Sequence, residues 1–247
     1  MLSWFNRAPK CPVDQQAKNW IEENFAWLSD EFGIETLREA QTVTPTAEFL
    51  PAKYKPTEPM INELLERVSR FMNIDPTSLV LSYYEDDKPI VGETEIEQFS
   101  TDNNCEIWLE ANSLQEPNCV VAALTREIAH VRLVLKHPQS TMDEDHEELS
   151  ELLAVFSGLG IFLANTAFYD SNWTSEGWTG WSVGKLSHLS MDMFGYAFAL
   201  YALARDENTP EWANFLRPDV RHPFEQGKRY ILATKDCGFV PALEKAV

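Results

Sequence analysis

The pattern of hydrophobic and polar positions predicts amphipathic helices over most of the chain. Residues 59–74 show it clearly, because their apolar side chains recur every three or four residues, the spacing of one helix face. These side chains are Met60, Leu64, Val68 and Phe71. Pro59 suits the first turn, where its missing N–H costs little. The same criteria predict further helices at residues 13–32, 117–136, 144–168, 185–205 and 224–234.

Two short segments follow a β pattern instead. Residues 79–84 are rich in Leu, Val and Tyr, and residues 105–109 alternate apolar with polar side chains, as strands do. Residues 40–58, rich in Pro and Thr, and residues 172–184, rich in Trp and Gly, are expected to be loops. The order of the predicted elements is helices, then a small mixed or antiparallel sheet, then more helices. This order indicates a mostly helical α+β fold.

Composition narrows the class of protein. The chain has 20 basic and 39 acidic residues, a net charge of -19, which opposes binding to nucleic acid or to an anionic membrane. Solubility is the simpler reason for so much acid, and the alternative is a surface that docks a basic protein or peptide. The four cysteines form no CxxC pair, and the first ten residues contain no apolar signal-peptide segment. We therefore expect reduced thiols and a cytoplasmic location.

Residues 124–131 carry the clearest chemical motif, Leu-Thr-Arg-Glu-Ile-Ala-His-Val. Zinc peptidases use His-Glu-x-x-His on a helix, where two histidines one turn apart reach the same metal and the glutamate acts on the metal-bound water. Glu127 and His130 stand in this register, but position 126 holds arginine. Seventeen residues after His130, Glu147 and Glu151 lie one turn apart at the start of an apolar helix.

Together these segments resemble the zincin fold, and within it the gluzincin families typified by thermolysin. The resemblance is closest to small bacterial zincin-like proteins of unassigned function, in which a helix similar to ALxHExAHVxL precedes an acidic helix running into AVFxGLGIF. It implies that His130 and Glu147 descend from metal ligands, that Glu151 supports them, and that Glu127 is the general base in any active form. Residues 105–109 would be the edge strand on the substrate side.

The resemblance covers about residues 105–205. It divides the chain into an N-terminal subdomain of helices and strands (residues 1–95), a zincin-like core (96–205) and a C-terminal helical extension (206–247).

Arg126 changes what the motif can do. A guanidinium has no lone pair to give a metal, so His130 and Glu147 remain, one short of the three protein ligands usual for catalytic zinc. Tight zinc binding is expected to be lost unless His146 or His137 substitutes. We interpret Arg126 as a replacement for the metal, neutralising the nearby carboxylates through bidentate hydrogen bonds. Alternatively, Arg126 points to solvent and the site is empty.

Each candidate also has an ordinary structural interpretation. Glu127 and His130 would then be polar residues of a half-exposed helix, and Glu147 and Glu151 would complement a helix N-terminus. On this view His146 and His137 lie on the surface and His188 is a core residue. The tryptophans of residues 172–184 either stack on a sugar or peptide or fold onto the core; they are Trp173, Trp178 and Trp181.

Three hypotheses follow. The first is a zincin-like pseudoenzyme without a cofactor that binds a protein or peptide in an inhibitor, immunity or regulatory role. The second is an active zinc-dependent metallopeptidase with a rebuilt ligand set. The third is a structural or regulatory module unrelated to peptidases. Metal content separates the first two, and the fold separates the third.

Overall fold

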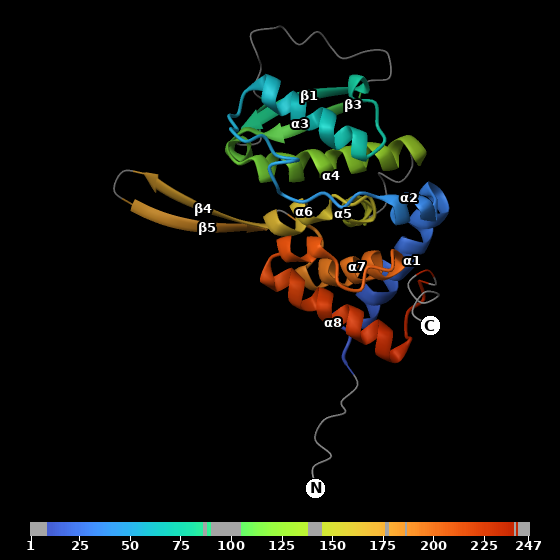
Figure 1. The fold of residues 1–247 in the computed structure, drawn as a ribbon. Coiled ribbons are helices and arrows are strands. Elements are labelled where there is room, and N and C mark those ends of the chain that lie inside the picture. Colours follow the sequence, from blue (N-terminus) through green and yellow to red (C-terminus); the bar gives the residue numbers. More distant parts are fainter. Residues whose placement is uncertain are drawn as a thin grey trace.

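The computed structural model describes residues 9–85, 88–89, 105–137, 145–175, 178–185, 187–239 and 241, with the backbone alone for 88–89 and 168–185. Figure 1 shows the small sheet with α3 and α4 in the upper part, α5 and α6 in the middle, and α7 and α8 below. The α-helices are α1 (Gln15–Phe32), α2 (Ile34–Glu39), α3 (Glu58–Phe71), α4 (Pro117–Lys136), α5 (His146–Phe156), α6 (Gly160–Thr166), α7 (Met191–Ala204) and α8 (Pro218–Thr234). The predicted mostly helical α+β class is confirmed.

The small sheet is mixed and has the order β2-β1-β3 within the described residues. The central strand β1 (Leu79–Glu85) is parallel to β3 (Cys105–Glu110) and antiparallel to β2 (Lys88–Pro89). Alternation along β3 buries Ile107 and Leu109, whereas Trp108 is 37% exposed. The pairing of β1 with β3 joins the predicted N-terminal subdomain to the predicted zincin-like core.

Helix α4 has the bounds that its pattern predicts, with Pro117 in its first turn. Val120, Leu124 and Ile128 are fully buried, and α4 packs against α5. The buried face stops before the end of the helix, because Leu135 is 60% exposed.

The predicted helix at residues 144–168 is wrong as a single element. Its described part consists of α5 and α6, separated by a turn at Ser157–Leu159. Gly158 has a φ of 86°, and a Cβ atom there would lie 2.6 Å from the carbonyl oxygen of Gln41. The Gly158 carbonyl also accepts a hydrogen bond from Val43 N–H at 2.8 Å. Glycine is needed here because this left-handed backbone packs directly against another segment.

One other element and the starts of two helices differ from the predictions. Most of the expected loop at residues 172–184 pairs as an antiparallel hairpin of β4 (Phe168–Ser175) and β5 (Trp178–Lys185). The side chains of the three tryptophans lie outside the described part. Helix α7 begins at Met191, where the hydroxyl of Ser190 caps it. Helix α8 begins at Pro218 and contains Pro223 internally.

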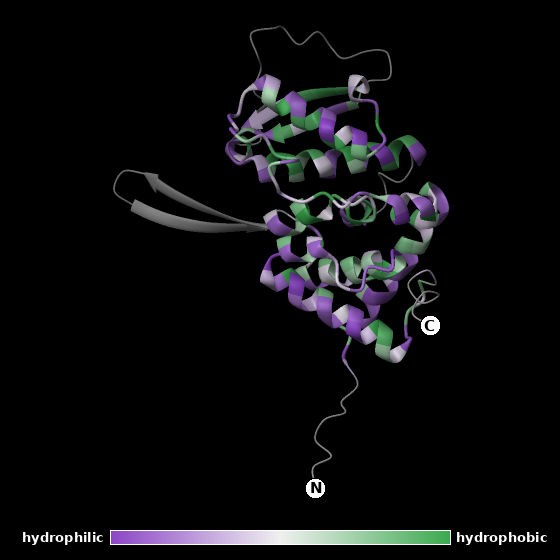
Figure 2. Cartoon of the chain, viewed as in Figure 1, coloured by the Kyte–Doolittle hydropathy of each residue, from purple (hydrophilic) through white to green (hydrophobic). Residues whose placement is uncertain are grey.

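The described elements share one hydrophobic core. The ring of Phe25 in α1 contacts Phe156 at 6.0 Å and Phe239 at 5.5 Å between centroids, joining distant parts of the sequence. Figure 2 shows hydrophobic residues along the faces where helices meet. Helix α7 is buried from Phe194 to Ala204. Within the described residues, no helix has the length and apolar character needed to cross a membrane.

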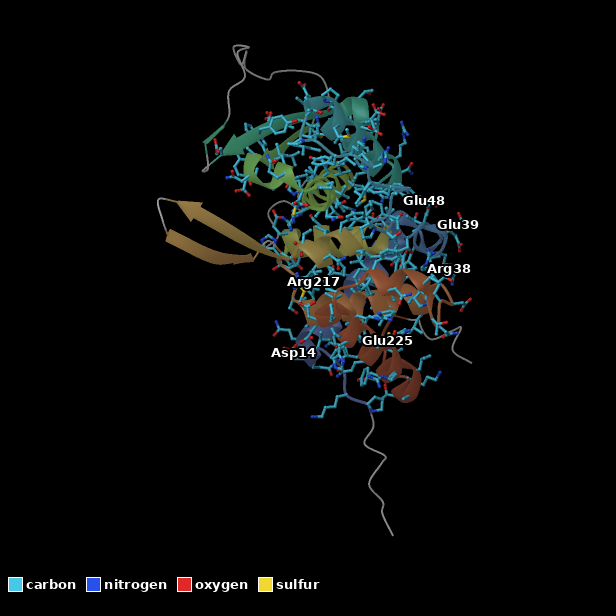
Figure 3. All side chains as sticks on the ribbon, turned by 60° about the vertical axis from the view of Figure 1, so that its left-hand side comes forward. Asp14, Arg38, Glu39, Glu48, Arg217 and Glu225 are labelled. Carbon is cyan, nitrogen blue, oxygen red and sulfur yellow. The ribbon has the colours of Figure 1, made fainter. Side chains whose placement is uncertain are left out.

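Acidic charge is spread over the surface. Asp14, Glu39 and Glu48 are exposed and come from three different segments (Figure 3). Net charge alone therefore does not identify a binding face.

Candidate functional site

An ion pair between α4 and α5 lies at the centre of the site. Arg126 Nη2 is 3.2 Å from Glu151 Oε1, and the side chains are 22% and 0% exposed respectively. Arg126 therefore faces a carboxylate, and the alternative in which Arg126 points to solvent is wrong. A carboxylate removed from water is costly without a cation or hydrogen bonds, so the charge of Arg126 offsets part of the cost of burying Glu151.

Glu151 also fixes the turn before α7. It accepts hydrogen bonds from the Ser187 hydroxyl at 2.6 Å, from His188 N–H at 3.1 Å and from Leu189 N–H at 2.9 Å. The imidazole of His188 lies at the surface, with its side chain 48% exposed, so its predicted core position is wrong. The error follows from placing His188 inside α7, which begins later. Glu151 thus connects α4, α5 and the segment leading into α7.

His130 and His146 form a direct hydrogen bond. His130 Nδ1 lies 2.8 Å from His146 Nε2, and the rings meet edge to face with centroids 4.5 Å apart. His146 is the first residue of α5 and only 5% exposed, so its expected surface position is wrong. The contact with His130 explains its burial. Because this bond occupies one nitrogen of each ring, a metal placed between the rings would first have to break it.

Glu127 and Glu147 complete the site. Burial, and then the negative charge of Glu147, raise the pKa of Glu127 to about 7, while Arg126 acts in the opposite direction. Burial and the neighbouring His146 lower the pKa of His130, and Glu147 opposes this shift. Glu147 itself is exposed in the first turn of α5. Glu127, His130 and Glu147 therefore lie within electrostatic reach of one another.

The other predicted substitute ligand, His137, is engaged elsewhere. Its Nε2 lies 2.9 Å from Glu31 Oε2, and its ring packs against Trp27 with centroids 5.2 Å apart. Both contacts are with α1. His137 therefore connects the end of α4 to α1.

The donor set does not fit a catalytic zinc ion as it stands. Within the described ranges, no three His, Cys, Asp or Glu side chains are arranged to hold a metal. His130 uses Nδ1 to contact His146, and the position before Glu127 carries a cation that a metal would repel. The chemistry of these residues favours an ion-paired site over a metal centre.

A small cavity adjoins Arg126 and Glu127. It has a volume of about 110 Å³, and its lining includes Tyr84, Trp108 and Glu110 from the sheet. Neither Trp108 nor Glu110 was singled out from the sequence. The alternation of residues 105–109 could have shown that Trp108 faces away from the core.

Comparisons with protein-family models, with curated proteins and with solved structures find no match.

The raised pKa of Glu127 predicts a pH-dependent effect on stability. The native carboxyl keeps its proton up to about pH 7, whereas the unfolded one loses it near 4.5. The native state therefore binds more protons in this window, so this group lowers the free energy of unfolding as pH rises through it. Above about pH 7, the ionised Glu127 should lower the free energy of unfolding by on the order of 2 kcal/mol. Glu127→Gln should remove this loss of stability. Thermal unfolding at pH 5 and pH 8 measures it, with the exposed Glu23→Gln as control; an equal effect at both pH values contradicts the assignment.

Proposed function

We propose that this protein is a zincin-like pseudoenzyme in which the guanidinium of Arg126 takes the place of the metal. The observation that carries the proposal is the 3.2 Å contact between Arg126 and the fully buried Glu151. The succession of strand β3, helix α4 and helix α5, with Glu127, His130 and Glu147 near one another, supports the zincin-like assignment. The position that would supply the first metal ligand instead supplies a positive charge.

The proposed role is to bind a protein or peptide as an inhibitor, immunity or regulatory protein in the cytoplasm. In the described part of the chain, β3 pairs with β1 alone, and an edge strand is where a peptide can add a further strand through main-chain hydrogen bonds. The net charge of -19 favours a basic partner. The cysteines Cys11, Cys105, Cys119 and Cys237 are free, in keeping with a reducing compartment.

One observation favours the alternative, an active metallopeptidase with rebuilt ligands. Two imidazole nitrogens bound to one tetrahedral zinc lie about 3.3 Å apart, and those of His130 and His146 are 2.8 Å apart. A small opening of this pair would let zinc enter, with Glu147 as a third ligand and Glu127 as general base. We favour the pseudoenzyme because this opening breaks an existing hydrogen bond and brings zinc toward the charge of Arg126.

Zinc content and peptide hydrolysis decide between these functions. We expect the native protein, purified without chelator, to carry far less than one zinc per chain. We also expect it to leave unfolded casein intact in zinc-containing buffer, because no metal-bound water is available. About one zinc per chain, together with cleavage that Glu127→Gln abolishes, would establish the metallopeptidase instead.

A further inference from the structure

The cavity beside Glu127 has the size of a site for one side chain. It lies where β3 meets α4, and its lining includes Trp108, Glu110, Ala123 and Glu127. Its volume of about 110 Å³ is well below the roughly 300 Å³ at which small-molecule sites begin. Trp108, one of its lining residues, is 37% exposed.

Among the described residues that line this cavity, carboxylates outnumber cations. Arg126 borders it, but its guanidinium is paired with the buried Glu151. Glu110 and Glu127 form no ion pair within the described residues. The exposed Glu147 adds further negative charge next to Glu127. An anionic group would be repelled here, and an apolar group would take water from Glu127 without replacing its hydrogen bonds.

We propose that this cavity binds an arginine side chain of a partner peptide or protein, with the guanidinium paired to Glu127 and stacked on Trp108. A planar guanidinium matches a carboxylate with two parallel hydrogen bonds and stacks on an indole, which an ammonium group does less well. Glu127 is then a cation-binding residue in a position where an active peptidase has its general base. This inference rests on the proposed function, since it specifies the partner that the pseudoenzyme recognises.

Two matched peptides test the inference on the full-length protein. The probe is acetyl-Thr-Ala-Thr-Arg-Thr-Ala-Thr-amide, and its control carries citrulline, the uncharged analogue of arginine, at the centre. We expect the arginine peptide to bind about tenfold more tightly in a calorimetric titration at pH 8, where Glu127 is ionised, the effect of one charge-assisted pair. Glu127→Gln should remove this preference, whereas Glu23→Gln, which deletes the same charge at an exposed position of α1, should retain it.

A second variant separates shape from charge. Ala123→Leu would fill the cavity while keeping both carboxylates, and should lose binding of the arginine peptide at least tenfold with an unchanged circular dichroism spectrum. Equal affinity for both peptides, a preference that survives Glu127→Gln, or no binding of either peptide would overturn the arginine site. Cleavage of the peptides would instead overturn the pseudoenzyme, so the two failures are distinguishable.

Discussion

Replacing Arg126 with alanine should lower the free energy of unfolding by about 2–3 kcal/mol. Arg126 is the cation that faces the fully buried carboxylate of Glu151 at 3.2 Å. Deleting one member of a buried pair costs about 3–5 kcal/mol because the other charge stays desolvated. We expect a smaller loss than this range here, since Arg126 is 22% exposed and Glu151 keeps its hydrogen bonds from Ser187, His188 and Leu189. The melting temperature should fall by about 5–10 °C.

A double substitution identifies the cause of this loss. If the uncompensated charge is responsible, Arg126→Ala combined with Glu151→Gln should be less destabilised than the two single changes predict together. Arg70→Ala is the matched control, because Arg70 pairs with Glu66 on the exposed face of α3 with side chains 71% and 55% exposed. Such surface ion pairs contribute little to the free energy of unfolding. An Arg126→Ala variant as stable as Arg70→Ala would show that the buried pair does not hold α4 to α5.

Replacing Arg126 with histidine should create a zinc site. The change restores the His-Glu-x-x-His spacing and removes the cation, so position 126, His130 and Glu147 supply the three ligands that catalytic zinc sites use. Without metal the variant should melt below the parent, because the pair with Glu151 is lost. Zinc at a hundred times its dissociation constant should raise the free energy of unfolding of the variant by about 2.7 kcal/mol. The melting temperature should then rise by roughly 5–10 °C.

The control for this gain is Arg126→Gln, which removes the charge without adding a ligand. Its melting temperature should not respond to zinc. If Arg126→His is equally insensitive while remaining folded, then His130 and Glu147 do not point toward position 126 as the spacing requires. Hydrolysis need not return with the metal, because a bound zinc does not by itself rebuild the substrate cleft.

The sequence predicted those parts of the fold that depend on local periodicity. Helix α4 and strand β3 follow from apolar spacing, because their apolar positions recur at the period of one face, and β1 follows from its content of β-prone residues. A spacing of four residues separates Arg126 from His130, and Glu147 from Glu151. Each pair therefore lies on one face of its helix, and a contact such as that of Arg126 with Glu151 follows when the two faces meet.

What the sequence did not reveal depends on tertiary contacts. The break at Gly158 results from its close approach to Gln41, more than a hundred residues away in the chain. The burial of His146 results from the ring of His130, and periodicity carries no sign of that contact. The exposure of His188 likewise depends on Glu151, which holds the turn before α7. In each case the deciding partner lies on another element.

The most direct measurement is a calorimetric titration of zinc into the native protein and into Arg126→His under identical conditions. Since we propose that the guanidinium takes the place of the first ligand, we predict no saturable zinc binding to the native protein and a one-to-one site in the variant. A saturable one-to-one zinc site in the native protein would contradict the claim that Arg126 has replaced the metal.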